Sequence, residues 1–417
     1  MTSVHAQSAN RSPGSMQVDW EDRVDMARLR SYRLGRVREQ LERCELGALL
    51  VLDTANIRYL TSSHIGYWAF NKLERYALVT RHGEPYIWDF GSAAMAHRLG
   101  CSWIEPSHSR AGNTGLGGTL GLESGLAERA AAEVRELLHA EGLDGATIGV
   151  DVIDIPLLRA LEGCGLRIVD GQQPMLFARE IKSPDEIVLL NQSAALVDAT
   201  YQRIFEALKP GVRESDIVAL ANDALYTLGS EHVECINSIA GERCSPHPHV
   251  FSDRVVRPGD QAYFDIVHAY NGYRTCYYRT FAVGRELPGQ RDAYRRAREW
   301  IDAAIALIKP GVSTDEIAAV WPAAGQFGFE SELEAFGLQF GHGVGLSVHE
   351  RPVISRLNSL DHPIELREGM VFALETYCPA ADGRSAARIE EEVVCTADGP
   401  ILLTRFPADE LMVANAY

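Results

Sequence analysis

The chain has 417 residues, of which 46% are apolar and 23% charged, a balance typical of a globular protein with one large domain or two. A formal net charge of −17 argues against nucleic acid as a partner, and no stretch approaches the roughly 20 apolar residues that span a bilayer. The eight cysteines form no CxxC pair, and the N-terminus lacks a signal-peptide pattern. We therefore expect reduced thiols in a cytoplasmic protein.

The first half of the chain alternates predicted helices and strands. We expect residues 1–17, which are rich in Ser, Asn, Gln and Gly, to form a disordered tail. Apolar spacing predicts helices at 20–46 and 123–141 and strands at 48–52, 76–80, 85–88 and 146–150. This alternation predicts an α/β domain over residues 18–182.

A second domain is predicted over residues 183–417. Ser183 and Glu186 form a capping box with Pro184 between them, which marks the start of a helix and the domain junction. Farther on, Lys-Pro-Gly-Val follows an apolar residue at 208–212 and again at 308–312, each time before a similar apolar pattern. Pro-Gly is a common way to end a helix, but the matching apolar positions favour an internal duplication.

Three acids stand out in strand-like runs of this second domain. Asp265, Glu375 and Glu390 lie in apolar sequence, where burying a charge requires a cation, a metal or hydrogen-bond donors. His342 lies between two glycines in the run 340–350. Carboxylates with an imidazole suit a divalent metal, and they suit metal-free acid–base chemistry equally well.

Several motifs together resemble the pita-bread superfamily of methionine aminopeptidases, Xaa-Pro peptidases and creatinase. They are Asn56-Ile57-Arg58-Tyr59-Leu60-Thr61, Lys182-Ser183-Pro184-Asp185-Glu186-Ile187, Arg257-Pro258-Gly259-Asp260, Gly341-His342-Gly343-Val344-Gly345, His349-Glu350-Arg351-Pro352, Glu368-Gly369-Met370-Val371-Phe372 and Arg388-Ile389-Glu390. The resemblance implies an α+β protein. Its C-terminal pita-bread catalytic domain would be a curved antiparallel sheet with helices and an internal pseudo-repeat, preceded by a smaller α/β creatinase-type N-terminal domain.

The resemblance also implies a ligand set with one departure. Metal-binding members of the superfamily hold two ions with two aspartates, a histidine and two glutamates. Asp265, His342, Glu375 and Glu390 match four of these, but Cys276 stands where the second, bridging aspartate is expected. Three readings follow: Cys276 binds one metal as a thiolate, the other four residues hold one ion, or no metal is bound. The expected cofactor is accordingly none, or one divalent ion such as zinc, manganese or iron.

Two branches of the superfamily are similar to this chain. Creatinase-like members and ectoine hydrolases lose metal ligands in the same segment, and a histidine before the first strand is central there; His247 matches it better than His249. The first domain is similar to that of dimethylsulfoniopropionate lyases, including the aromatic pair Tyr67-Trp68. That branch keeps its metal aspartates, whereas this chain has Cys276 at one of those positions.

These resemblances lead to a hydrolase of the creatinase type, acting on a C–N bond in a small polar molecule, as the expected function. His247, Glu375 and Glu390 are the predicted catalytic residues, with His247 as proton shuttle because an imidazole titrates near neutrality. The predicted substrate contacts are His349, His342, Asp265, Tyr67, Trp68 and His64. A lyase, a single-metal Xaa-Pro dipeptidase and a non-catalytic binding domain are the alternatives, and the resemblance implies a homodimer.

Overall fold

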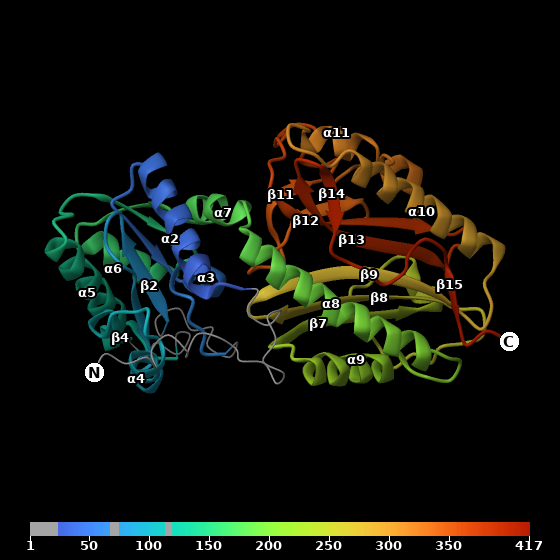
Figure 1. Ribbon diagram of the computed structural model, residues 1–417, viewed down its shortest axis with the longest axis horizontal. Coiled ribbons are helices and arrows are strands. Elements are labelled where there is room, and N and C mark those ends of the chain that lie inside the picture. The colour runs from blue at the N-terminus through green and yellow to red at the C-terminus, as the bar shows by residue number, and fades with distance from the viewer. Residues whose placement is uncertain (1–23, 67–74, 113–118) are drawn as a thin grey trace. The chain divides into compact units, whose positions relative to one another are not determined.

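The computed structural model describes residues 24–66, 75–112 and 119–417 (Figure 1). The tail predicted over residues 1–17 and the aromatic pair Tyr67-Trp68 lie outside these residues. The chain forms two compact units, Met1–Arg179 and Glu180–Tyr417. The domain junction just before Ser183 remains a prediction. None of the helices in the described part is both long and apolar enough to cross a bilayer.

The first unit is built on one mixed sheet with the strand order β4-β3-β2-β1-β5-β6. Its strands are β1 (Ala48–Val51), β2 (Tyr76–Thr80), β3 (Tyr86–Asp89), β4 (Ser109–Ala111), β5 (Thr147–Val150) and β6 (Arg167–Asp170). Its helices are α2 (Met26–Arg43), α3 (Thr54–Thr61), α4 (Gly91–Gly100), α5 (Leu126–Ala140), α6 (Ile155–Gly163) and α7 (Gln172–Glu180). The predicted hairpin is β2 paired antiparallel with β3. Helices and strands alternate along this unit, as predicted. The apolar strand β1 is buried along its whole length and lies in the middle of the sheet, between β2 and β5.

The second unit contains two sheets, β15-β9-β8-β7 and β11-β10-β12-β13-β14. Their strands are β7 (His232–Ala240), β8 (Gln261–Tyr270), β9 (Tyr273–Val283), β10 (Phe340–Gly343), β11 (Glu350–Ile354), β12 (Val371–Pro379), β13 (Ala386–Thr396), β14 (Gly399–Leu402) and β15 (Met412–Ala414). The helices are α8 (Pro184–Ala207), α9 (Glu214–Leu228), α10 (Pro288–Ala306) and α11 (Thr314–Ala319). All the pairings are antiparallel except that of β15 with β9.

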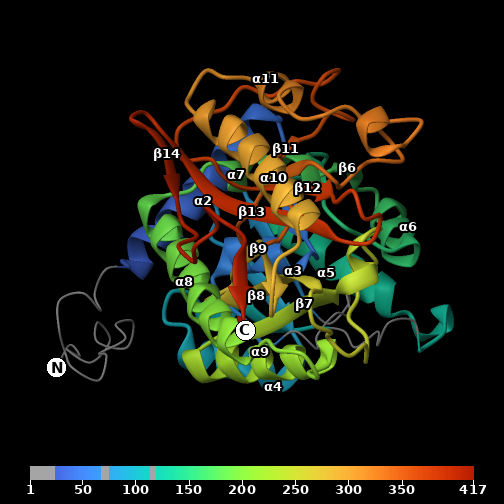
Figure 2. The same cartoon turned by 90° about the vertical axis from the view of Figure 1, so that its right-hand side faces the viewer.

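Each sheet of the second unit has its own pair of helices. Helices α8 and α9 pack on the strands β7, β8 and β9, whereas α10 and α11 pack on the other sheet (Figures 1 and 2). Two apolar cores fill these helix–sheet layers. Strand β9 of one sheet contacts β13 of the other, and the Thr280 hydroxyl donates to the Arg388 carbonyl at 2.6 Å. The polar faces of the two sheets therefore meet each other.

The predicted internal repeat is visible in the backbone. Gly211, with φ +97°, donates its N–H to the Val256 carbonyl at 2.9 Å. Gly311, with φ +88°, donates to the Leu366 carbonyl at the same distance. A positive φ is accessible to glycine without steric cost, which explains why glycine stands at both turns. Each Lys-Pro-Gly-Val segment thus makes the same turn between its two helices.

Candidate active site

Five of the sequence-predicted site residues share the polar faces where the two sheets meet. Side chains alternate along a strand, so positions two apart point to the same face. Register pairs Glu375 on β12 with Glu390 on β13, and Asp265 on β8 with Tyr278 on β9. The five are all buried, with exposed fractions between 0% and 7%; they are Asp265, Cys276, His342, Glu375 and Glu390.

The Cys276 thiol lies between two carboxylates. Its Sγ is 3.5 Å from Oδ1 of Asp265 and 3.9 Å from Oε2 of Glu390. Burial, reinforced by the negative charges of Asp265 and Glu390, raises the pKa of this thiol well above its usual value. Without a cation beside it, Cys276 is therefore a protonated donor to the two acids.

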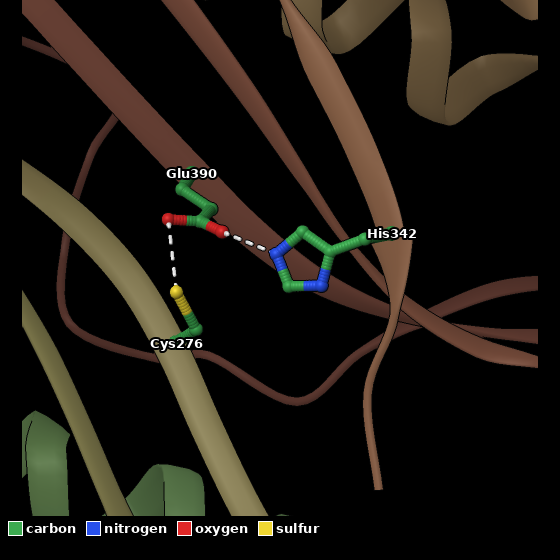
Figure 3. Close-up of side chains that lie close together, drawn as sticks. All are labelled: Cys276, His342 and Glu390. Atoms are coloured by element: carbon green, nitrogen blue, oxygen red, sulfur yellow. Dashed lines mark hydrogen bonds and ion pairs between the residues drawn. The ribbon is translucent and has the colours of Figure 1, made fainter. Parts of the chain in front are cut away.

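His342 presents one ring nitrogen to Glu390. Its Nδ1 is 3.1 Å from the Gly343 carbonyl oxygen, which can only accept, so Nδ1 carries the proton. Burial lowers the pKa of His342 to about 4, and the ring is neutral at pH 7. The lone pair of Nε2 then faces Oε1 of Glu390 at 3.8 Å (Figure 3). This tautomer is the one expected of a metal-ligating histidine.

The donor set of Cys276, His342 and Glu390 fits one divalent ion. One ligand atom from each residue lies within 4.8 Å of the others (Figure 3). Sulfur, imidazole nitrogen and carboxylate oxygen are all zinc donors. Oε1 of Glu390 is buried and has no hydrogen-bond partner among the described residues. A buried acid without a donor is costly, and a cation at this point would satisfy it.

The other expected ligands are already engaged by protein groups. Oδ2 of Asp265 accepts a hydrogen bond from the Asn237 amide at 3.0 Å. Glu375 forms an ion pair with the Arg388 guanidinium, which also lies over the Tyr278 ring, 4.5 Å from its centroid. Burial and the neighbouring Glu375 raise the pKa of Asp265 to about 6. This part of the site is a hydrogen-bonded protein network.

His247 joins that network through Tyr278. Its Nε2 is 2.9 Å from the Tyr278 hydroxyl, and its Nδ1 accepts the backbone N–H of His249 at 3.2 Å. The neutral ring therefore carries its proton on Nε2 and donates to Tyr278. Burial, and next the positive Arg388, lower the pKa of His247 to about 2. This lowered pKa differs from the near-neutral titration expected of His247, because the loop half-buries the ring; the catalytic role of His247 stays a prediction.

One buried acid fixes the loop that carries His247. Oε1 of Glu214 accepts from the Ala240 N–H at 2.8 Å, and its Oε2 accepts from the Ser252 N–H at 2.7 Å. The same Oε2 is ion-paired with Arg243. Glu214 thus holds both ends of the segment between Ala240 and Ser252.

The remaining predicted residues are placed differently. The exposed His349 ring has its centroid 4.5 Å from that of His342, whereas Tyr67 and Trp68 fall outside the described residues. His64 belongs to the first unit.

Sequence reasoning missed Asn237, Tyr278 and Arg388. Tyr278 and Arg388 lie two residues from Cys276 and Glu390, so strand alternation could have indicated them.

Comparisons with known proteins assign the chain to a family. Residues 188–397 match the model of metallopeptidase family M24. A probable dipeptidase, PepE of Mycobacterium tuberculosis, is 32% identical over 279 residues, which cover 65% of this chain and 72% of the relative. The dimethylsulfoniopropionate lyase DddP of Roseovarius nubinhibens is 26% identical over 409 residues, covering 94% of this chain and 89% of that one.

Solved structures agree on the fold. Dipeptidase PepE from Mycobacterium ulcerans matches with a TM-score of 0.72 at 23% identity, over 94% of this chain and 99% of that one. A dipeptidase from Pyrococcus horikoshii OT3 matches with a TM-score of 0.75 at 19% identity, over 91% and 99%. The predicted superfamily and α+β fold class are confirmed, and peptidases of this family use divalent metals. The chain belongs to metallopeptidase family M24.

Proposed function

We propose that this chain is a hydrolase of the creatinase type, which cleaves an amide, amidine or ring C–N bond in a small polar molecule. The observation that carries the proposal is the 2.9 Å contact between His247 Nε2 and the Tyr278 hydroxyl beside the buried acids. This contact supports a role for His247, which resembles the histidine that is central in the creatinase branch. The position of the bridging aspartate is taken by Cys276, which weakens the case for a two-metal dipeptidase.

A chain of hydrogen bonds can deliver a proton to the nitrogen that leaves when the C–N bond breaks. His247 donates to the Tyr278 oxygen, and hydrogen bonds from Tyr278 and Cys276 act on Asp265. Hydrolysis adds the hydroxyl of water to the carbon and a proton to the nitrogen. In this proposal the Tyr278 hydroxyl, polarised by its two partners, gives its proton to the nitrogen and regains one from the attacking water, so that water supplies both the hydroxyl and the proton.

Glu375, Arg388 and Glu390 have different roles in the proposed binding of the substrate. Glu375 is ion-paired with Arg388, whereas Oε1 of Glu390 has no hydrogen-bond partner among the described residues and is available to accept from a cationic or amide-bearing substrate. Where a divalent ion is bound, Cys276, His342 and Glu390 would hold it, and the ion would supply a Lewis acid that polarises the bond under attack. His349 would line the pocket beside His342.

A substrate panel tests the proposal. Purified protein is incubated with creatine, ectoine, small N-acyl amino acids and Xaa-Pro dipeptides, and released amine or ammonia is measured. We expect turnover of one of the small C–N compounds and its loss in His247→Gln, while the exposed His139→Gln variant keeps it. Cleavage of Xaa-Pro dipeptides alone, or full activity of His247→Gln, would overturn the proposal.

A lyase is the second candidate, favoured by one observation. Similarity to the dimethylsulfoniopropionate lyase covers 94% of this chain, against 65% for the dipeptidase PepE. Release of dimethyl sulfide from dimethylsulfoniopropionate, without uptake of water, would establish that activity instead. Assembly as a homodimer and a cytoplasmic location remain predictions, and light scattering tests the first.

A further inference from the structure

We propose that the chain binds a single divalent ion of the zinc class, through the thiolate of Cys276, Nε2 of His342 and a carboxylate oxygen of Glu390. This goes beyond the proposed hydrolase, because the ion, its number and its sulfur ligand can be measured without any substrate.

The three donors converge from three strands. Cys276 is on β9, His342 on β10 and Glu390 on β13, and their exposed fractions are 7%, 1% and 0%. Ligand atoms around a tetrahedral zinc ion lie about 3.5 Å apart, given bonds of about 2.0–2.3 Å. The observed spread of up to 4.8 Å needs only small side-chain rotations to close. Strand backbones fix the three Cα positions, so the set is prearranged.

Two independent features of these side chains point to a cation. Nδ1 of His342 is committed to the Gly343 carbonyl, which leaves the Nε2 lone pair directed at the cluster. Oε1 of the fully buried Glu390 has no hydrogen-bond partner among the described residues, and Arg388, the guanidinium on the same face, is paired with Glu375 instead. A positive ion between His342 and Glu390 would satisfy both groups at once.

The rest of the site argues for one ion rather than two. A second ion would need Asp265 and Glu375, but Asn237 donates to Asp265 and Arg388 is ion-paired with Glu375. The Arg388 guanidinium would also repel a second cation at close range.

Binding involves no redox step. The Cys276 S–H bond breaks, a sulfur–metal bond forms with the sulfur lone pair, and the thiol proton leaves to the solvent. The hydrogen bonds that the thiol makes to Asp265 and Glu390 are lost, and Glu390 becomes a ligand.

Cobalt substitution tests the inference directly. The untagged full chain is stripped with a chelator and titrated with Co²⁺, then with Zn²⁺, while near-ultraviolet absorbance reports sulfur-to-cobalt charge transfer. Elemental analysis gives the ratio of zinc to protein. We expect one ion per chain, a charge-transfer band with Co²⁺, and loss of that band when Zn²⁺ displaces it.

Matched variants identify the sulfur. Cys276→Ser should lose the band and bind zinc at least ~10-fold more weakly, whereas the exposed Cys235→Ser should keep both. Cys276→Asp, which restores an oxygen ligand, should bind metal without the band, so the test survives if the serine variant folds poorly. No bound metal, two ions per chain, or cobalt binding without a charge-transfer band would each overturn the inference, whatever reaction the protein catalyses.

Discussion

Arg388 and Glu375 form a buried ion pair across the adjacent strands β13 and β12. The guanidinium also donates to the Gly337 carbonyl at 2.8 Å. Removing the cation would leave Glu375 buried without its partner, which costs roughly 3–5 kcal/mol. We expect Arg388→Met to lower the free energy of unfolding by about that amount in urea titrations.

The double variant Arg388→Met/Glu375→Gln provides the control for the ion pair. Replacing both partners removes the unpaired charge, so this variant should recover much of the lost stability. Equal stability of the single and double variants would show that the cost comes from lost packing of Arg388 instead of the charge.

Tyr278→Phe tests the hydroxyl that accepts a hydrogen bond from His247. The variant keeps the ring under Arg388 but leaves Nε2 of His247 without its oxygen partner. If the hydroxyl donates a proton in the reaction, kcat should fall by about 10²–10⁴. Stability should fall by only about 1–2 kcal/mol, because a single hydrogen bond is removed.

Tyr270→Phe is the matched control for Tyr278→Phe, since Tyr270 lies at the end of β8 and packs against an apolar core. It should change kcat less than twofold. A Tyr278→Phe enzyme with wild-type kcat would remove Tyr278 from the mechanism.

Glu214 should govern the loop that carries His247. Glu214→Ala leaves the N–H groups of Ala240 and Ser252 without their acceptor. We expect a loss of about 2–4 kcal/mol in stability and faster hydrogen exchange over residues 241–252. Asp223→Ala, at an exposed position on the same helix α9, should change stability by less than about 0.5 kcal/mol. Unchanged exchange in Glu214→Ala would show that other contacts hold the loop.

Because His268 is buried as a neutral ring, we expect the protein to lose stability in mild acid. The ring is fully buried on β8, with Nε2 donating to the Ser193 carbonyl and Nδ1 bonded to the Ser230 hydroxyl, both at 2.9 Å. Burial lowers its pKa to about 4, against about 6.5 in an unfolded chain. The unfolded state therefore takes up the proton first, and stability falls from about pH 6.5 to about pH 4, by up to about 3 kcal/mol.

The difference between wild type and His268→Gln isolates this contribution, because His247 and His342 titrate in the same direction. We expect the variant to be less stable at pH 7 but to lose less stability on acidification, measured by urea unfolding between pH 7 and pH 4. Parallel pH profiles for the two proteins would contradict the assignment.

Much of the site follows from strand alternation and motif spacing. Asp265, Glu375 and Glu390 could be predicted as one buried cluster because each is an acid inside an apolar strand, and the structure brings them together with His342. Cys276 could be located from the neighbouring Arg279-Thr280 pair. Their metal or catalytic roles remain predictions.

The network around His247 could not be predicted in the same way. Asn237 is adjacent to Asp265 only through the register of β7 with β8, which no local pattern specifies. The pairing of Arg388 with Glu375 depends on the order of strands in the second sheet. Burial lowers the pKa of His247, and that burial comes from a loop whose two ends donate hydrogen bonds to Glu214.

The two Lys-Pro-Gly-Val turns, with their matching bonds from Gly211 and Gly311, have a consequence for how such a site can change. The first half of the repeat supplies Cys276 and the second supplies His342 and Glu390, so the cluster lies on the seam between two related modules. A module that keeps its own helices and core can exchange one ligand without disturbing the other. Cys276 can therefore be replaced within the first half while the second half continues to provide His342 and Glu390.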